Sequence, residues 1–88
     1  MNNKNKNEVI VMLRILTNML GKKIGYAEGD WNIDYASCYG GYIVVEYMEN
    51  GGEHHPLMNK RVKKSEMISC LDMAICTARH ILNNKEVS

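Results

Sequence analysis

The sequence predicts an α+β domain in which a helix, a two- or three-stranded antiparallel sheet and a second helix follow one another, with both helices on one sheet face. Two patterns favour this class. Near both ends of the chain apolar residues recur every three or four positions, as on one face of a helix, whereas the middle alternates between apolar and polar residues. The 88 residues, 1–88, are the size of one small domain.

The first helix is predicted over residues 6–20, after a polar start (1–5) that we expect to be disordered. Its main apolar positions share one helical face and are Val9, Met12, Leu13, Leu16 and Leu20. Gly21 supplies a stop signal. Because Val11 and Ile15 widen the apolar stripe, we expect this helix to be covered on more than one side.

The middle of the chain is predicted to form strands. The candidate segments are residues 24–28, which are weak, residues 31–39, and residues 42–49, which are the strongest. Gly40 and Gly41 are expected to form a turn or bulge between the last two. Residues 53–62 are expected to form a loop or a short edge strand, since Pro56 is excluded from a central strand.

The second helix is predicted over residues 65–82, ended by Asn83 and Asn84. Its apolar positions keep the spacing of an amphipathic helix and are Met67, Ile68, Leu71, Ala74, Ile75, Ala78, Ile81 and Leu82. A domain of this size buries only about 60% of the surface of its unfolded chain. Packing of the excess apolar helix surface between subunits would bury more, so a homo-oligomer is expected.

The formal net charge of +1 conceals a segregation of charge. Both ends are basic, whereas residues 24–59 contain six acidic residues and no Lys or Arg. The acids of that segment are Glu28, Asp30, Asp34, Glu46, Glu49 and Glu53. Because an acidic sheet should repel a phosphate backbone, nucleic acid is an unlikely partner, and weak binding by the basic ends would be strongly salt-dependent.

The composition also bears on location. The three cysteines are an odd number, no signal peptide is recognised, and no stretch of about 18 apolar residues occurs. Free thiols in a reducing compartment follow, so the sequence predicts a cytoplasmic protein without a membrane span, in the host cytoplasm if it is phage-encoded.

The cysteines and histidines do not predict a metal site, a cofactor site or a catalytic site. Cys76 and His80 share a helix face with Cys70 about two turns earlier, but paired C-x-x-C spacing is absent. His54 and His55 follow Cys38 across a turn without a local nucleophile signature, so catalytic residues are not assigned. Whether any of these six residues binds a metal stays open.

A basic segment before the second helix predicts an anion site. Lys60, Arg61, Lys63 and Lys64 lie where the helix macrodipole is already positive and first-turn N–H groups are free. Arg61 is the leading candidate because its planar fork binds an anion bidentately. The alternative is a solvated basic loop, or one paired with the acidic segment of a neighbouring subunit.

Tyrosines gather on or beside the predicted strands, and Tyr39 and Tyr42 lie nearest the Gly-Gly turn. A tyrosine ring with its hydroxyl suits a surface that is half apolar and half wet, so these residues could stack on a base or line a subunit interface. The alternative is that they are core aromatics.

A second interaction surface is predicted from four acids. The predicted surface would present negative charge to a basic host protein and so mimic nucleic acid. Its residues are Asp30, Asp34, Glu46 and Glu49. This protein–protein adaptor or inhibitor is the alternative to binding of a small anion.

Four short motifs in the C-terminal half resemble a known group. In order they are Tyr39-Gly40-Gly41-Tyr42, Gly51-Gly52, Arg61, and Lys64-Ser65-Glu66-Met67 before an amphipathic helix. This order, over residues 31–82, is similar to that of small hypothetical proteins of phages, prophages and related mobile elements. Lys63 stands where Ser or Thr often precedes the group's helix entry.

The resemblance implies a setting rather than a biochemical role: a small protein made inside a bacterial host. Small phage proteins often counteract host defence by occupying a protein surface or by sequestering a nucleotide-like signal. The sequence therefore predicts a non-enzymatic binding protein of this type, with a small anionic ligand or a host protein as its partner.

Overall fold

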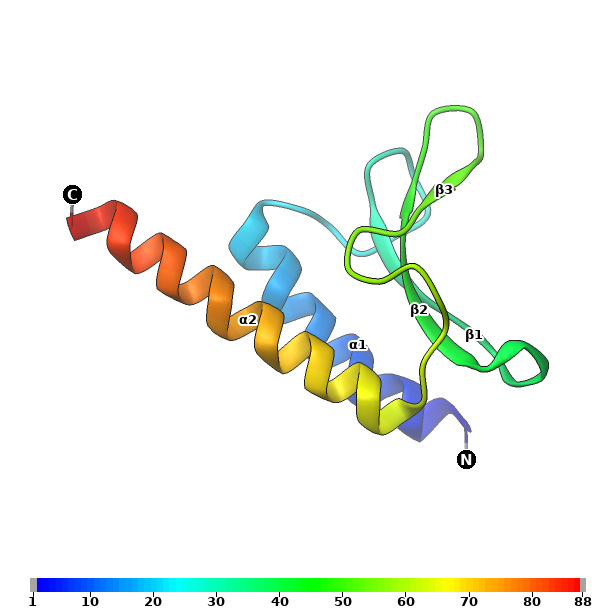
Figure 1. Cartoon of the computed structure of the whole chain (residues 1–88). Coiled ribbons are helices and arrows are strands. Elements are labelled where there is room, and N and C mark those ends of the chain that lie inside the picture. Colours follow the sequence, from blue (N-terminus) through cyan, green and yellow to red (C-terminus); the bar gives the residue numbers. More distant parts are fainter. Residues whose placement is uncertain (1, 88) are drawn as a thin grey trace.

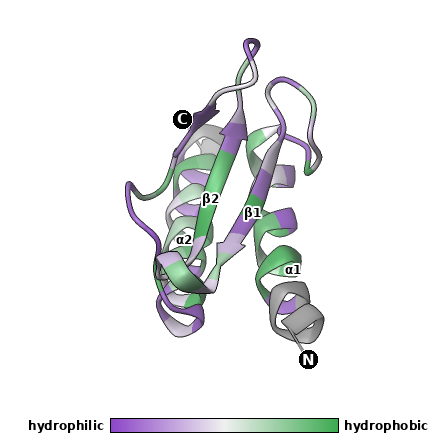
Figure 2. Cartoon of the chain, turned by 90° about the vertical axis from the view of Figure 1, so that its right-hand side faces the viewer, coloured by the Kyte–Doolittle hydropathy of each residue, from purple (hydrophilic) through white to green (hydrophobic). Residues whose placement is uncertain are grey.

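The computed structural model describes the backbone of residues 2–87 and the side chains of residues 8–84, and it confirms the predicted α+β class. In chain order the elements are helix α1 (Asn2–Leu20), strand β1 (Trp31–Ala36), the 3₁₀ helix η1 (Ser37–Tyr39), strands β2 (Gly41–Tyr47) and β3 (Glu53–His54), and helix α2 (Lys64–Val87). The helix pair lies against one face of the sheet, giving two layers (Figure 1, Figure 2). Within residues 2–87, no helix is long and apolar enough to cross a membrane.

The sheet is antiparallel, with β2 between β1 and β3. The register pairs Ile33 with Val44 and Tyr35 with Tyr42. β3 pairs with the last residues of β2, whereas Val62 forms a bridge with Tyr42 near its first residue. The segment from β3 to Val62 therefore pairs with the same edge of β2 at two places. Helix α2 begins directly after this segment.

The hydrophobic core lies between the helix pair and the sheet. Its buried members come from both layers and are Val9, Leu13, Leu16, Trp31, Ile33, Tyr42, Val44, Val62, Met67, Leu71 and Ile75. Ile33 and Val44 lie opposite each other on the helix-facing side because cross-strand partners point to the same face. Leu13, Met67 and Leu71 are fully buried, and truncating such a residue to Ala typically costs about 2–5 kcal/mol.

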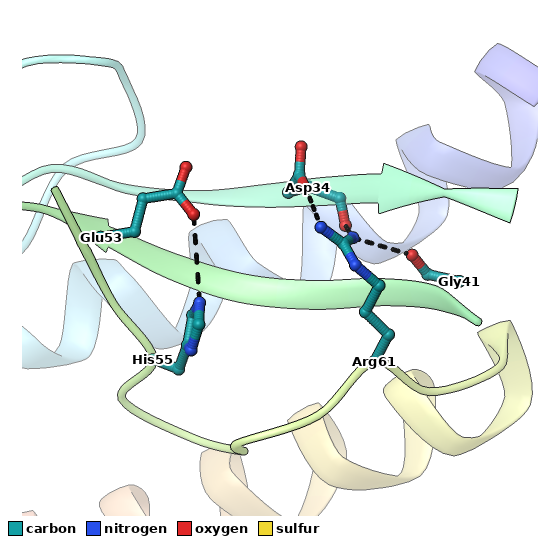
Figure 3. Close-up of polar contacts among 5 residues, drawn as sticks. All are labelled: Asp34, Gly41, Glu53, His55 and Arg61. Carbon is teal, nitrogen blue, oxygen red and sulfur yellow. Dashed lines mark hydrogen bonds and ion pairs between the residues drawn. The ribbon is translucent and has the colours of Figure 1, made fainter. Parts of the chain in front are cut away.

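The opposite face of the sheet also buries apolar side chains. Ile43 and Val45 alternate with the core residues of β2 and are only 4% and 0% exposed. The stem of Arg61 crosses β2 on this face and brings the guanidinium to Asp34 on β1 (Figure 3). The long side chain therefore covers part of a face that has no helix layer.

The ends of both helices differ from prediction. α1 begins at Asn2 instead of residue 6, so it includes residues 2–5; Met1 lies outside the described residues. α2 runs through Asn83 and Asn84 to Val87, so the predicted stop is wrong. The physical reason is that Asn costs a helix at most about 0.7 kcal/mol relative to Ala, and neither Gly nor Pro follows in the sequence.

The strand boundaries differ as well, and the segment predicted over residues 42–49 forms β2 at Gly41–Tyr47. The weak candidate over residues 24–28 forms only an isolated bridge between Ile24 and Trp31, because a turn begins at once: the Asp30 carboxylate accepts a hydrogen bond from the Ala27 N–H at 3.1 Å. The strand predicted over residues 31–39 ends at Ala36, since η1 and Gly40, which has a φ of 103°, turn the chain into β2.

Candidate ligand-binding site

A recess lies where the turn between β1 and β2 meets the start of α2. The N–H groups of Tyr42 and Val62 each donate to the other residue's carbonyl oxygen at 2.8 Å, and α2 begins two residues after Val62. Gly41 permits this close approach: it has a φ of 119°, and a Cβ there would lie 2.5 Å from the Val62 carbonyl oxygen. The Gly-Gly pair thus lets the turn meet the helix entry without a side chain between them.

The recess has a volume of about 360 Å³. Seven residues line it: Tyr35, Ser37, Gly40, Gly41, Tyr42, Lys63 and Lys64. The rings of Tyr35 and Tyr42 are cross-strand partners with centroids 4.6 Å apart and planes inclined by 46°. Tyr42 is buried, whereas Tyr35 is 41% exposed and therefore offers ring surface to a ligand.

The positive charge at the recess comes from two lysines at the first turn of α2. The Lys64 ammonium lies 2.9 Å from the Glu8 carboxylate of α1, whereas Lys63 is exposed. The first helical hydrogen bond of α2 runs from the Met67 N–H to the Lys63 carbonyl oxygen at 2.9 Å. The N–H groups of residues 64–66 therefore precede the helical ladder and add the positive end of the helix dipole.

The structure brings together three of the six predicted anion-site residues: Lys63, Lys64 and Tyr42. Tyr39 is the last residue of η1; it is 76% exposed and does not line the recess. Lys60 is an exposed residue of the loop before Val62 and is likewise not part of the lining.

Arg61, the leading candidate from the sequence, is bound to the sheet. One guanidinium nitrogen donates to the carbonyl oxygens of Asp34 and Gly41 at 3.2 and 3.1 Å, and another contacts the Asp34 carboxylate (Figure 3). The fork does not bind a carboxylate bidentately, because only one of its nitrogens contacts the carboxylate and the other donates to backbone carbonyls. That carboxylate belongs to the protein's own β1, and Arg61 does not line the recess.

Sequence reasoning missed three contributions to the recess: Tyr35, Ser37 and the turn backbone at Gly40 and Gly41. A signal for Tyr35 was present, because it and Tyr42 are nearly equidistant from the turn and must face each other in a hairpin. No comparable signal marks Ser37, since its position depends on the 3₁₀ turn that replaces the end of the predicted strand.

The four acids predicted as a protein-binding surface do not form one unpaired patch. Asp34 is paired with Arg61, and the Glu46 carboxylate accepts a hydrogen bond from the Lys22 ammonium at 3.1 Å. This hydrogen bond lowers the pKa of Glu46 below its ordinary value of 4.5, against the raising effect of burial. The Asp30 carboxylate accepts a hydrogen bond from the Ala27 N–H within its own turn. Glu49 is exposed.

A smaller acidic hollow lies at the other end of the sheet. Glu28, Glu46 and Glu49 line it together with Gly29, Tyr47 and Met48, and its volume is about 250 Å³. The Gly29 N–H donates to the Tyr47 carbonyl oxygen at 2.8 Å, which holds the loop before β1 against the end of β2. Two of the four predicted acids, Glu46 and Glu49, therefore do lie together, with Glu28 as a third.

The cysteines and histidines lie apart. Cys38 precedes β2, whereas His54 pairs with Glu46, which lies five residues, or about 17 Å, from the first residue of that strand. His55 lies 4.0 Å from Glu53, and the His80 ring accepts or donates a hydrogen bond with Asn84 at 3.1 Å. Across the described part of the chain, no three His, Cys, Asp or Glu side chains converge as a metal site.

Comparison with protein-family models, curated proteins and solved structures finds no match for this chain. The resemblance to phage and mobile-element proteins therefore stays a prediction from short motifs. What the candidate site can do rests on the geometry of the recess.

Proposed function

We propose that this chain is a binding protein whose recess takes a small phosphate-bearing ligand of the nucleotide class. The observation that carries the proposal is the convergence of Lys63, Lys64 and the exposed Tyr35 ring around one hollow of about 360 Å³. This volume lies in the lower part of the range for small-molecule sites, about 300–1,000 Å³.

The lining offers separate groups for the two ends of a nucleotide, its phosphate and its base. Lysine ammonium groups beside first-turn N–H groups suit a phosphate, which accepts several charge-assisted hydrogen bonds. The Tyr35 ring suits a base, since base–aromatic stacking contributes about 1–3 kcal/mol and tolerates any base. The lining contains Tyr, Ser, Gly and Lys only, and these residues offer rings, a hydroxyl, backbone groups and ammonium groups to a nucleotide.

Glu8 sets the strength of this site. Its carboxylate already holds the Lys64 ammonium at 2.9 Å, so a phosphate must compete with an internal partner. Glu8 is 63% exposed and the pair is accessible to water, which makes the internal contact weak. A ligand with two or three negative charges would therefore displace it more readily than a singly charged one.

The test is isothermal titration calorimetry of the full chain with AMP and with inorganic pyrophosphate, up to millimolar ligand. Lys63→Ala should weaken AMP binding about tenfold or more, because a charge-assisted contact is lost. Glu8→Gln should strengthen it roughly two- to fivefold, since the competing carboxylate is removed. Lys60→Ala is the matched control, because it removes the same charge from a residue outside the lining.

Two results would contradict the proposal. One is the absence of measurable AMP or pyrophosphate binding to the unaltered protein. The other is binding that Lys60→Ala weakens as much as Lys63→Ala, which would indicate attraction by net charge alone. Weakening of AMP but not pyrophosphate binding in Tyr35→Leu would support stacking of the base on this ring.

In a bacterial host, such a protein would withdraw a nucleotide-like signal from the cytoplasm and so counteract host defence. This part of the proposal rests on the resemblance of Tyr39-Gly40-Gly41-Tyr42 and the helix entry to phage and mobile-element proteins. Sequestration needs no turnover, only a protein concentration above that of the signal and a dissociation constant below it.

The competing proposal is a protein–protein adaptor that uses acidic residues against a basic host protein. The hollow lined by Glu28, Glu46 and Glu49 favours it, although Lys22 already neutralises part of the charge. A Glu28→Lys, Glu49→Lys double variant would abolish capture of such a partner and leave AMP affinity unchanged. The recess proposal expects the reverse sensitivity, with Lys63→Ala affecting AMP alone.

A further inference from the structure

Helix α2 is longer than the sheet it supports. Its 24 residues span about 36 Å, whereas the seven residues of β2 span about 23 Å. The end of α2 therefore extends about 13 Å beyond the length of β2 (Figure 1), and we refer to residues 73–87, which include this end, as the overhang. The amphipathic stripe of α2 continues along the overhang: Ala74 and Ala78 still pack against the core, whereas Leu82 is 38% exposed.

An apolar groove of about 400 Å³ runs along this overhang. α1 contributes Leu16 and Leu20 to its wall, and the loop before Val62 contributes Leu57. Large side chains on the groove remain open to solvent: Leu20 is 46% exposed, Met73 70%, Ile81 58% and Leu82 38%. Contiguous exposed apolar surface of this kind marks an interaction site in a folded domain.

We propose that a second copy of this chain occupies the groove, with the two overhangs packed antiparallel about a two-fold axis near Ala78. Along α2 the lining alternates in size, since Ala74 and Ala78 lie between the larger Met73 and the larger Ile81 and Leu82. Antiparallel packing about Ala78 sets Leu82 of each copy over Ala74 of the other, so a large side chain of each copy enters the hollow over a small residue of its partner. One surface thus carries both the hollow and the side chains that fill it, as a two-fold contact requires.

The charge of the groove fits this occupant. All nine lining residues are uncharged, with Thr77 as the one hydroxyl-bearing member. A charged residue close to a two-fold axis would lie opposite its own copy, where like charges are repulsive, so an uncharged lining is what self-association needs. An ionic partner would find no complementary charge there.

The exposed area predicts a weak dimer. Leu20, Met73, Ile81 and Leu82 together expose the equivalent of only about two whole residues per copy. With the alanines and the polar rim of both copies, the interface stays at or below the ~1,200 Å² of weak complexes. The expected dissociation constant is therefore in the micromolar range, about 1–100 µM.

Sedimentation equilibrium of the full chain over a concentration series measures this constant directly. Ile81→Lys should raise it about 10- to 100-fold, because the charge would be buried without a partner. Val11→Lys is the matched control: Val11 is an exposed helix residue at 56%, close to the 58% of Ile81, but it does not line the groove. Both positions are exposed, so neither substitution should prevent folding.

A charge-swap variant tests the antiparallel arrangement. An axis near Ala78 brings Met73 of one copy close to Ile81 of the other, so Met73→Glu and Ile81→Lys should each give monomers. The two single variants mixed, or both substitutions in one chain, should restore the dimer by pairing Glu with Lys across the axis. A chain that stays monomeric at millimolar concentration, a Val11→Lys variant that dissociates as readily as Ile81→Lys, or a charge swap that restores nothing would overturn the proposal.

Discussion

Replacing Arg61 by Met removes the guanidinium while keeping most of the apolar stem that crosses β2. The lost contacts are hydrogen bonds to the carbonyl oxygens of Asp34 and Gly41, at 3.2 and 3.1 Å, and the ion pair with the Asp34 carboxylate. The Asp34 side chain is 46% exposed, so its ion pair is screened and contributes about 0.5 kcal/mol. Two part-buried hydrogen bonds from a charged donor add about 1 kcal/mol each, so the variant should lose roughly 2.5 kcal/mol of unfolding free energy in all.

A loss of about 2.5 kcal/mol lowers the melting temperature of a domain of this size by about 10–20 °C. Thermal unfolding followed by circular dichroism measures this shift. Lys60→Met is the control, because it removes a neighbouring exposed charge and should change the melting temperature by no more than about 3 °C. Below the transition, the Arg61→Met variant should bind AMP like the unaltered protein, since Arg61 does not line the recess.

Equal melting temperatures for Arg61→Met and Lys60→Met would refute this reasoning, because they would mean that the internal contacts of the guanidinium contribute nothing measurable. A stable Arg61→Met variant that lost AMP binding would instead return Arg61 to the ligand site predicted from the sequence. The two assays therefore separate a structural role from a binding role.

Two further predictions concern pH and backbone geometry. Because the Lys22 hydrogen bond lowers the pKa of Glu46 in the folded state, Glu46 stabilises the fold at neutral pH and loses this contribution as the pH falls below its ordinary value of 4.5. Glu46→Gln should therefore melt lower than the unaltered protein at pH 7 and equally in acid, and a difference that is constant with pH would contradict this. Gly41→Ala should cost at least ~2 kcal/mol in urea unfolding, because its Cβ would lie 2.5 Å from the Val62 carbonyl oxygen. Gly51→Ala also has a positive φ, 83°, but open space around it, so a cost of only about 1 kcal/mol is expected; equal costs would argue against the close approach at Gly41.

The fold class and the helix faces could be predicted because they depend on local periodicity. The apolar spacing from Met67 to Ile75 places its members on one side of a helix, and the structure buries Met67, Leu71 and Ile75 against the sheet. Local signals were weaker at element ends. Asn83 and Asn84 reduce helix propensity only slightly, so they did not stop α2.

The candidate site was predictable in part. Lys63 and Lys64 follow from their place before a helix, which is a local property. The partner of Arg61 is not local, since Asp34 lies 27 residues earlier and meets the guanidinium only because Val62 pairs with Tyr42 at the edge of β2.

The sequence alone determines two amphipathic helices, an antiparallel strand pair with a Gly-Gly turn and a basic helix entry. Each of these features depends on about twenty neighbouring residues. Only the tertiary structure determined which lysines share a recess with Tyr35 and that Arg61 binds the sheet. It also determined that the apolar stripe of α2 extends past the end of the sheet. These depend on strand register and on the relative lengths of α2 and the sheet, which arise from contacts between residues far apart in the chain.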